Sequence, residues 1–360
     1  MTDMTDWHPG HQVQMFGIEE AQRRAEAAGA TPGERKKLKE RLDIAQGILS
    51  ALPSAEDLSF LHSGLCQIGL PHSRPTSNQT IWARRSGRLS LLIKPGAYDN
   101  RITTSRGLYP TPEEQETMFA GLPYGARARL ILIFLQGEAV ARGREVVLGD
   151  SLSAWMRSLG VVPSSGPRGA IASVREQALR IGLCSFTVQW DGVDAAGNQV
   201  ISLRDVPIVE GLELAAKPGV VGMWPKSVFL GQSFYEHLKE HAVPLDKRAV
   251  AYLSGNSLGL DLYALFAYRL PRLKADLSLR WTDLAEQMGA GDSSMSSFGQ
   301  RVREVLPDVL SAYPEAKVDV TKHGLTLRPS QPSVPRTMVN GLRLLNGKRS
   351  NEALVHKSGR

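Results

Sequence analysis

Arginine and serine stand together on one predicted helix, over residues 170–181, in a combination that suits DNA binding. With the apolar residues of this helix directed inward, Ser173, Arg175 and Arg180 fall on its outward surface, and Arg168 lies in the loop before it. Guanidinium groups bind phosphate and guanine bidentately, and hydroxyl groups bind the sugar–phosphate backbone. Arg168 and Arg175 are therefore the first candidates for a phosphate or guanine contact.

A second predicted helix, which starts at Phe298, repeats this combination of hydroxyl, amide and guanidinium groups. A predicted hairpin follows it and carries further cations at its tip and its end. The candidate DNA-binding residues of this half are Ser297, Gln300, Arg301, Arg303, Lys322 and Arg328. The competing interpretation of both helices is a pair of solvated faces on a protein-interaction module.

The elements around the first of these helices follow the order of a winged-helix domain, in which one helix is presented to the major groove. Hydrophobic periodicity and the Gly, Pro and Ser clusters between the periodic segments define these elements. The prediction comprises helices over 126–141, from Ser151 to about Gly160 and over 170–181, a short extended segment at 145–148, and hairpin strands over 185–190 and 199–206.

The same order returns in the second half of the chain. The predicted segments are helices over 258–270, 282–288 and from 298 onward, an extended segment at 277–280, and hairpin strands over 316–321 and 324–328. Pro307 interrupts the last helix, where it predicts a kink or a new start. Two tandem winged helices are the simplest interpretation.

The resulting fold class is α+β and helix-rich, with two tandem winged-helix domains after a helical and irregular N-terminal region. Within that region we expect helices between 18 and 51, strands at 80–84 and 89–94, and an irregular linker at 53–79. From residue 328 on, seven basic side chains face one acidic side chain, which favours a basic, flexible tail. The predicted domains are 1–110, 111–210, 211–330 and the tail 331–360.

The composition is that of a globular protein. The 360 residues include 43 basic and 36 acidic side chains, for a net charge of +7. Hydrophobic residues make up 42% of the chain, so the protein as a whole is not intrinsically disordered. The longest apolar run, 262–268, is far too short to span a membrane. Two cysteines provide no disulfide framework. We therefore expect a cytoplasmic protein that does not associate with membranes.

Several catalytic patterns fail on inspection, and the sequence predicts neither an enzyme nor a metal or other cofactor. Residues 255–259, GNSLG, match the hydrolase nucleophile elbow, but a helix is predicted where a strand should precede Ser257, which we expect to be a helix N-cap. His237 and His241 lack the glutamate of a zinc-protease motif. His62, Cys66 and His72 lack a fourth ligand. A hydrolase built on Ser257 remains a minor alternative.

Several spaced blocks resemble the plasmid-encoded RepA replication initiators, over about residues 120–335. The blocks include LPYGARARL at 122–130, LGDSL at 148–152, MRSLG at 156–160, SFGQ at 297–300 and GLTL at 324–327. The resemblance implies a protein that binds repeated sequences of double-stranded origin DNA and promotes opening of an adjacent AT-rich duplex.

The resemblance also implies a host replication initiator and a replicative helicase as partners, and a homodimer that represses its own promoter. Two winged helices in one chain would cover two successive major grooves, about 34–36 Å apart. Bending of the duplex would help to melt AT-rich sequence nearby. The alternative is a winged-helix transcriptional regulator or autorepressor without a role in melting.

Overall fold

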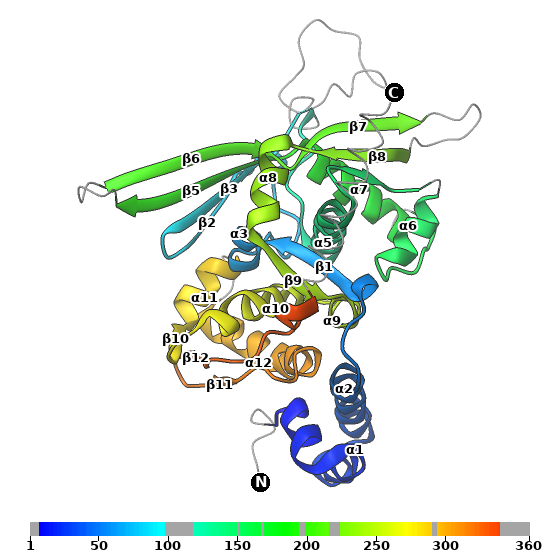
Figure 1. Cartoon of the computed structure of the whole chain (residues 1–360), viewed down its shortest axis with the longest axis vertical. Helices are drawn as coiled ribbons and strands as arrows, with labels where there is room; N and C mark the ends of the chain where they lie inside the picture. The colour runs from blue at the N-terminus through cyan, green and yellow to red at the C-terminus, as the bar shows by residue number, and fades with distance from the viewer. Residues whose placement is uncertain are drawn as a thin grey trace, which may run out of the picture.

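The computed structural model describes residues 7–97, 118–149, 151–166, 169–193, 199–215, 224–289 and 294–338 (Figure 1). Helices and small antiparallel sheets make up the described chain, so the expected α+β class is confirmed. Within these residues, no helix is both long and apolar enough to cross a membrane. The candidate Arg168 and tail residues 339–360 lie outside the described residues.

Two N-terminal helices, α1 (Pro9–Ala28) and α2 (Pro32–Ser50), form a hairpin at one end of the molecule (Figure 1). A capping box starts α2: the Thr31 side chain accepts from the N–H of Glu34, and the Glu34 carboxylate accepts from the N–H of Thr31. Arg41 of α2 donates to Asp308 at 2.6 Å, in the last long helix of the chain. The hairpin is thereby attached to the second half of the protein.

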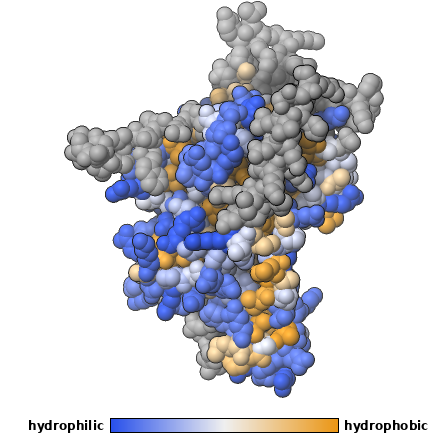
Figure 2. All heavy atoms as spheres, in the orientation of Figure 1, coloured by the Kyte–Doolittle hydropathy of each residue, from blue (hydrophilic) through white to orange (hydrophobic). Residues whose placement is uncertain are grey.

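Apolar side chains gather on the surface at this end of the molecule, as Figure 2 shows. Met15 of α1 and Leu52, just after α2, are 74% and 71% exposed. Elsewhere on the visible face, the described surface is mostly hydrophilic (Figure 2).

The segment predicted as an irregular linker, 53–79, contains regular and buried structure. It holds a 3₁₀ turn (Ala55–Asp57), strand β1 (Leu58–His62) and helix α3 (Ser63–Gln67). All five residues of β1 are buried, because the strand pairs antiparallel with β9 (Ala242–Asp246) and packs against α3 and the helix at residues 125–142. A partner that is so distant in sequence leaves no local signal, and the Pro, Ser and Gly content of the flanking residues obscured the strand.

The first predicted unit begins with α5 (Gly125–Arg142) and β4 (Glu145–Val147). It continues with α6 (Leu152–Ser158), α7 (Ala170–Leu183), β5 (Ser185–Val193), β6 (Gln199–Pro207), β7 (Val209–Ala215) and β8 (Trp224–Leu230). The helices and strands predicted here lie within one or two residues of these bounds at most ends. Helix α8 (Gln232–His241) then leads into β9.

The β5–β6 hairpin, which was predicted as the hairpin of the first winged helix, does not pair with the short strand β4. It pairs through β5 with β3 (Leu89–Lys94), which pairs with β2 (Trp82–Ser86), in the order β2-β3-β5-β6. Strand β4 instead joins the next hairpin, in the order β4-β8-β7. The sheet that contains β4 therefore extends beyond residue 210, the predicted end of the first winged-helix domain.

The second unit matches its predicted element order closely. After the short helix α9 (Lys247–Tyr252), it contains α10 (Ser257–Arg269), a 3₁₀ turn (Leu270–Arg272), β10 (Leu277–Arg280), α11 (Trp281–Met288), α12 (Met295–Ala312), β11 (Val318–Val320) and β12 (Gly324–Leu327). The three strands form a sheet in the order β10-β12-β11. Pro307 lies inside α12, and the helix continues through it without restarting.

Helix α5 lies between the two units and contributes to the cores of both. Leu130 and Ile133 belong to the core that α10 and α12 dominate, whereas Ile131 and Leu135 pack with α6 and α7. A helix that is apolar all round is buried on all sides, which explains the strongly apolar middle of this segment. The two units therefore share one structural element.

The start of the predicted tail is anchored. Val334 is 1% exposed and packs on Leu58 and Phe60 of β1, with Met338 beside it. A flexible tail over 331–360 is therefore wrong for residues 331–338.

Candidate nucleic-acid interface

Helix α12 presents a polar N-terminal half. The Ser294 hydroxyl accepts from the N–H of Ser297 at 3.2 Å and caps the helix, and the Ser297 hydroxyl donates to the Ser294 carbonyl. Ser297, Gln300 and Arg301 are all exposed. The Gln300 amide donates to Glu304 at 3.0 Å, a pair one helical turn apart. The structure therefore brings three of the predicted side chains to one accessible surface.

Trp281 connects this helix to the β11–β12 hairpin. Its indole N–H donates to the Lys322 carbonyl at 3.1 Å, and its backbone N–H donates to the His323 carbonyl at 2.9 Å. The Arg303 guanidinium lies 4.9 Å from the indole ring centre, in a cation–π contact. The Arg303 guanidinium and the Lys322 backbone thus both contact one indole. Sequence reasoning missed Trp281, although a tryptophan directly before the predicted helix 282–288 was a usable signal.

Arg328 is at the far end of this hairpin and is held by acidic side chains. It pairs with Asp319 on β11 and lies 3.9 Å from Asp276. Half of its side chain is exposed, but the two carboxylates oppose a phosphate contact there. Arg328 is thus the weakest of the predicted contacts in this half.

On α7 the predicted residues divide into exposed and buried groups. Arg175 is exposed, and Ser173, which is half-buried, accepts a hydrogen bond from Arg127 of α5 at 2.8 Å. The Arg127 guanidinium therefore lies beside the predicted surface and is a further cation that the sequence did not single out.

Arg180 is a correction, because its side chain is 3% exposed. Its guanidinium donates to the Leu122 carbonyl at 2.9 Å and to Glu176 at 2.8 Å, and it lies 5.2 Å from the Tyr124 ring centre. This arginine holds the start of α5 against α7 and is not available to DNA. The sequence prediction assigned only apolar positions to the buried face of the helix. It therefore placed Arg180 outward, because a charged residue that is buried with its own partners does not follow the apolar pattern.

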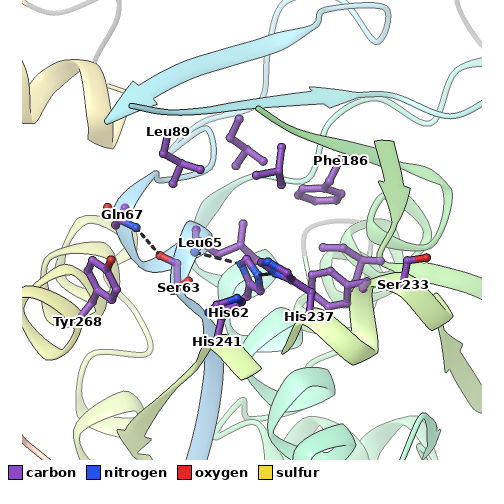
Figure 3. A pocket seen from close by; sticks show the side chains of 15 residues that line it. His62, Ser63, Leu65, Gln67, Leu89, Phe186, Ser233, His237, His241 and Tyr268 are labelled. Carbon is purple, nitrogen blue, oxygen red and sulfur yellow. Dashed lines mark hydrogen bonds between the residues drawn. The ribbon is translucent and has the colours of Figure 1, made fainter. Parts of the chain in front are cut away.

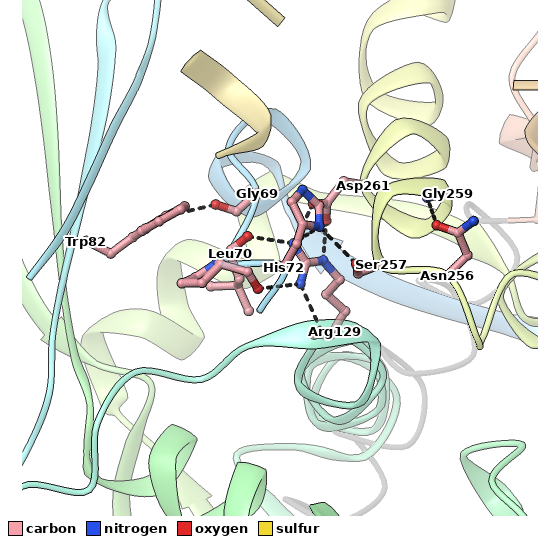
Figure 4. Close-up of polar contacts among 11 residues, drawn as sticks. Gly69, Leu70, His72, Trp82, Arg129, Asn256, Ser257, Gly259 and Asp261 are labelled. Atoms are coloured by element: carbon pink, nitrogen blue, oxygen red, sulfur yellow. Dashed lines mark hydrogen bonds and ion pairs between the residues drawn. The ribbon is translucent and has the colours of Figure 1, made fainter. Parts of the chain in front are cut away.

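A buried ion pair joins the two units where α5 crosses α10 (Figure 4). Arg129 donates to both oxygens of Asp261 at 2.6 Å, and its side chain is 5% exposed. The same guanidinium donates to the carbonyl oxygens of Leu70, Pro71 and Gly125. Such a bidentate pair, with its remaining donors satisfied, fixes the relative position of both helices.

Ser257 of the GNSLG motif lies beside this pair. Asn256, and not Ser257, is the N-cap of α10; the Ser257 hydroxyl instead lies 2.9 Å from Nδ1 of His72. Nε2 of His72 is 3.8 Å from Asp261. In a hydrolase triad the carboxylate accepts a hydrogen bond from the histidine and orients it. Here Arg129 occupies that carboxylate, so the cluster has the geometry of a structural contact.

A cavity of about 490 Å³ lies between α3, the sheet containing β3 and β5, and α8 (Figure 3). His62, His237 and His241 cluster on one wall, with Nε2 of His62 2.6 Å from Nδ1 of His237. Burial, with the charges of the other two histidines, lowers the pKa of His62 to about 3. Across the described part of the chain, no group of three ligating side chains has a geometry that would hold a metal ion.

The comparisons with known proteins found a family that part of the chain resembles. Residues 122–283 match the family described as plasmid encoded RepA protein. The predicted resemblance is thus confirmed over this segment, which runs from just before α5 into α11. No curated protein matches the chain significantly.

Two of the solved structures that resemble the chain are crystal structures of domains 2 and 3 of RctB. One has a TM-score of 0.46 at 12% identity and covers 74% of this chain and 98% of its own. The other has a TM-score of 0.40 at 13% identity and covers 73% and 94%.

Proposed function

We propose, from the match of residues 122–283 to the RepA family, that the protein is a plasmid replication initiator that binds repeated double-stranded origin DNA. The family match is the observation that carries the proposal. The exposed polar surface at the start of α12 supplies hydroxyl, amide and guanidinium groups of the kinds that contact bases and phosphates. In this proposal the protein acts by binding DNA and not by catalysis.

The second unit supports this function through its topology. It contains three helices, a strand between the first two and a C-terminal hairpin. Its three strands form a sheet in the order β10-β12-β11. In our proposal this is a winged helix in which α12 enters the major groove and the β11–β12 hairpin is the wing. Trp281 would hold the wing and Arg303 in a fixed relation.

The first unit supports a second winged helix with an inserted hairpin. The order β4-β8-β7 repeats β10-β12-β11, strand for strand, with α7 in the place of α12. In this interpretation β7–β8 is the wing, and β5–β6 is an insertion that extends a separate sheet. Arg175 would then be the exposed cation of the first recognition helix.

Binding of labelled origin repeats tests the proposal. Arg175→Ala and Arg301→Ala should each weaken specific binding by about 1–3 kcal/mol, since each removes a base or phosphate contact. The matched control is Arg23→Ala, which removes an exposed arginine of α1 that is paired with Glu20. Unchanged affinity in both helix variants would remove α7 and α12 as the DNA-contacting helices.

Plasmid maintenance separates an initiator from a regulator. A plasmid that carries the origin should persist only when this protein is supplied, and the AT-rich segment should become reactive to single-strand probes when the protein binds. We include recruitment of a host initiator and replicative helicase, and autorepression by a homodimer, in the proposal. A protein that represses its promoter but does not maintain the plasmid would be the transcriptional regulator instead.

A further inference from the structure

The segment between α3 and β2 lies against the second unit at both of its ends. The Gly69 N–H donates to the Gln287 carbonyl at 2.8 Å, at the end of α11. The Trp82 indole donates to the Gly69 carbonyl at 3.0 Å, and its ring covers Gly289, where an added Cβ would come within 2.3 Å of it. Residues 69–82 therefore begin and end beside the C-terminal end of α11.

The middle of the same segment reaches the first unit. The Gly125 N–H donates to the Pro71 carbonyl at 2.9 Å, at the start of α5. Arg74 lies 3.9 Å from Glu176 of α7, the residue that follows Arg175. The segment thus runs between the end of α11, the helix before α12, and α7.

The end of α11, the helix before α12, is a part of the second unit that this segment contacts. Gly69 bonds to Gln287 there, and Trp82 covers Gly289. The segment therefore lies against α7 at Arg74 and against the end of α11 at Gly69 and Trp82.

The exposed part of the segment has a composition that suits a polyanion. Residues 71–80, PHSRPTSNQT, contain one arginine and no acidic residue, and Ser73, Arg74, Thr76 and Gln79 are exposed. The Arg74 side chain is 58% exposed, and a pair of 3.9 Å at such exposure contributes little. Arg74 can therefore leave Glu176 and contact DNA at a small cost in free energy.

Two recognition helices in successive major grooves on one face of B-DNA have a minor groove between them. Arginine is the side chain that most often enters a narrow, AT-rich minor groove. We propose that residues 71–80 form the centre of the DNA-binding face and that Arg74 enters the minor groove between the sites of α7 and α12. This inference rests on the proposed function.

Base analogues at the central base pairs test the minor-groove contact. Diaminopurine·T adds an amino group to the minor groove of A·T and leaves the major groove unchanged, whereas inosine·C keeps the A·T minor groove and alters the major groove. Diaminopurine should weaken wild-type binding by about 5-fold or more, as one lost base contact does, and inosine·C should have little effect. Arg74→Ala should bind about 5-fold or more weakly and lose its sensitivity to diaminopurine.

Two control variants accompany Arg74→Ala. Arg85→Ala removes another exposed arginine with a carboxylate partner, Asp191, and should leave affinity unchanged. Glu176→Gln frees Arg74 without removing it and should keep the diaminopurine effect. Thermal unfolding of Arg74→Ala and Arg85→Ala should match the wild type, whereas Glu176→Gln also weakens the contact with the buried Arg180 and should unfold at a lower temperature.

Full affinity of Arg74→Ala with an unchanged diaminopurine effect would overturn the inference. So would a wild-type protein that is insensitive to diaminopurine, even if Arg74→Ala binds all DNA more weakly, because Arg74 would then contact phosphate alone. If the wild type does not bind origin DNA at all, the proposed function fails. If Arg175→Ala and Arg301→Ala weaken binding and Arg74→Ala does not, only this inference fails.

Discussion

Arg175 and Arg180 share a residue type and a helix, and their surroundings give them opposite roles. Arg175 is exposed, whereas Arg180 is enclosed by Leu122, Glu176 and Tyr124. Periodicity identified the helix and its apolar positions. It could not identify Arg180 as buried, since the carbonyl of Leu122 comes from a segment 58 residues away.

Arg180→Ala should lower the free energy of unfolding by about 2–3 kcal/mol, because a buried carbonyl loses a charged donor and α7 loses its contact with the start of α5. Urea denaturation measures this loss. Arg175→Ala, on the exposed face of the same helix, should change it by less than about 0.5 kcal/mol. Equal effects of the two substitutions would contradict the assignment of roles.

The strands show a limit of prediction at the level of elements. Alternating residues identified β2, β3, β5 and β6 as strands and the turn between β5 and β6 as a hairpin. They could not identify the partners, because pairing depends on contacts across the fold: β3 lies about 90 residues before β5, and β1 about 180 before β9. The second unit was predicted more fully because its sheet forms from neighbouring segments.

Trp281 provides a test at the level of elements, because it joins α11, α12 and the β11–β12 hairpin. Trp281→Leu removes the hydrogen bond to Lys322 and the ring beside Arg303, whereas Trp281→Phe keeps a ring and loses only the hydrogen bond. We expect DNA affinity to fall in the order wild type, Phe, Leu, by up to about 10-fold, or about 1.4 kcal/mol. Fluorescence anisotropy on labelled origin repeats measures this affinity. Equal affinities of the wild type and both variants would show that the hairpin and α12 bind independently.

At the level of the whole molecule, the buried pair between Arg129 and Asp261 holds the two units together. Arg129→Ala should cost about 3–5 kcal/mol of unfolding free energy, because it leaves the Asp261 carboxylate buried without its partner. Replacing both residues by apolar ones of similar volume should cost less than the single change. A larger loss in the double variant than in Arg129→Ala would contradict this account.

Stability should also depend on pH through three buried histidines. Burial lowers the folded-state pKa of His8 and His72 to about 4 and of His62 to about 3, below the usual 6.5. Between these values the unfolded chain binds protons that the folded chain does not, so stability is complete above pH 6.5 and falls on acidification. The slope is about 1.4 kcal/mol per pH unit for each histidine.

Denaturation curves recorded between pH 4 and 7 measure this effect. His62→Gln should flatten the dependence, whereas His323→Gln, an exchange at an exposed position of the β11–β12 turn, should leave it unchanged. A wild-type stability that is constant over this range would contradict neutral burial of these groups.

The pairing of β4 with β8, beyond the β5–β6 hairpin, determines how the chain can be divided. A fragment that ends near residue 210 retains β4 and loses the strand that covers its edge, while a fragment that starts there keeps β8 without β4. Because α5 also supplies side chains to both cores, either piece would expose apolar surface and an open backbone edge, which are the features that drive aggregation. Deletion mapping of this protein would thus report misfolded halves, and origin recognition has to be dissected by point substitutions in the intact chain.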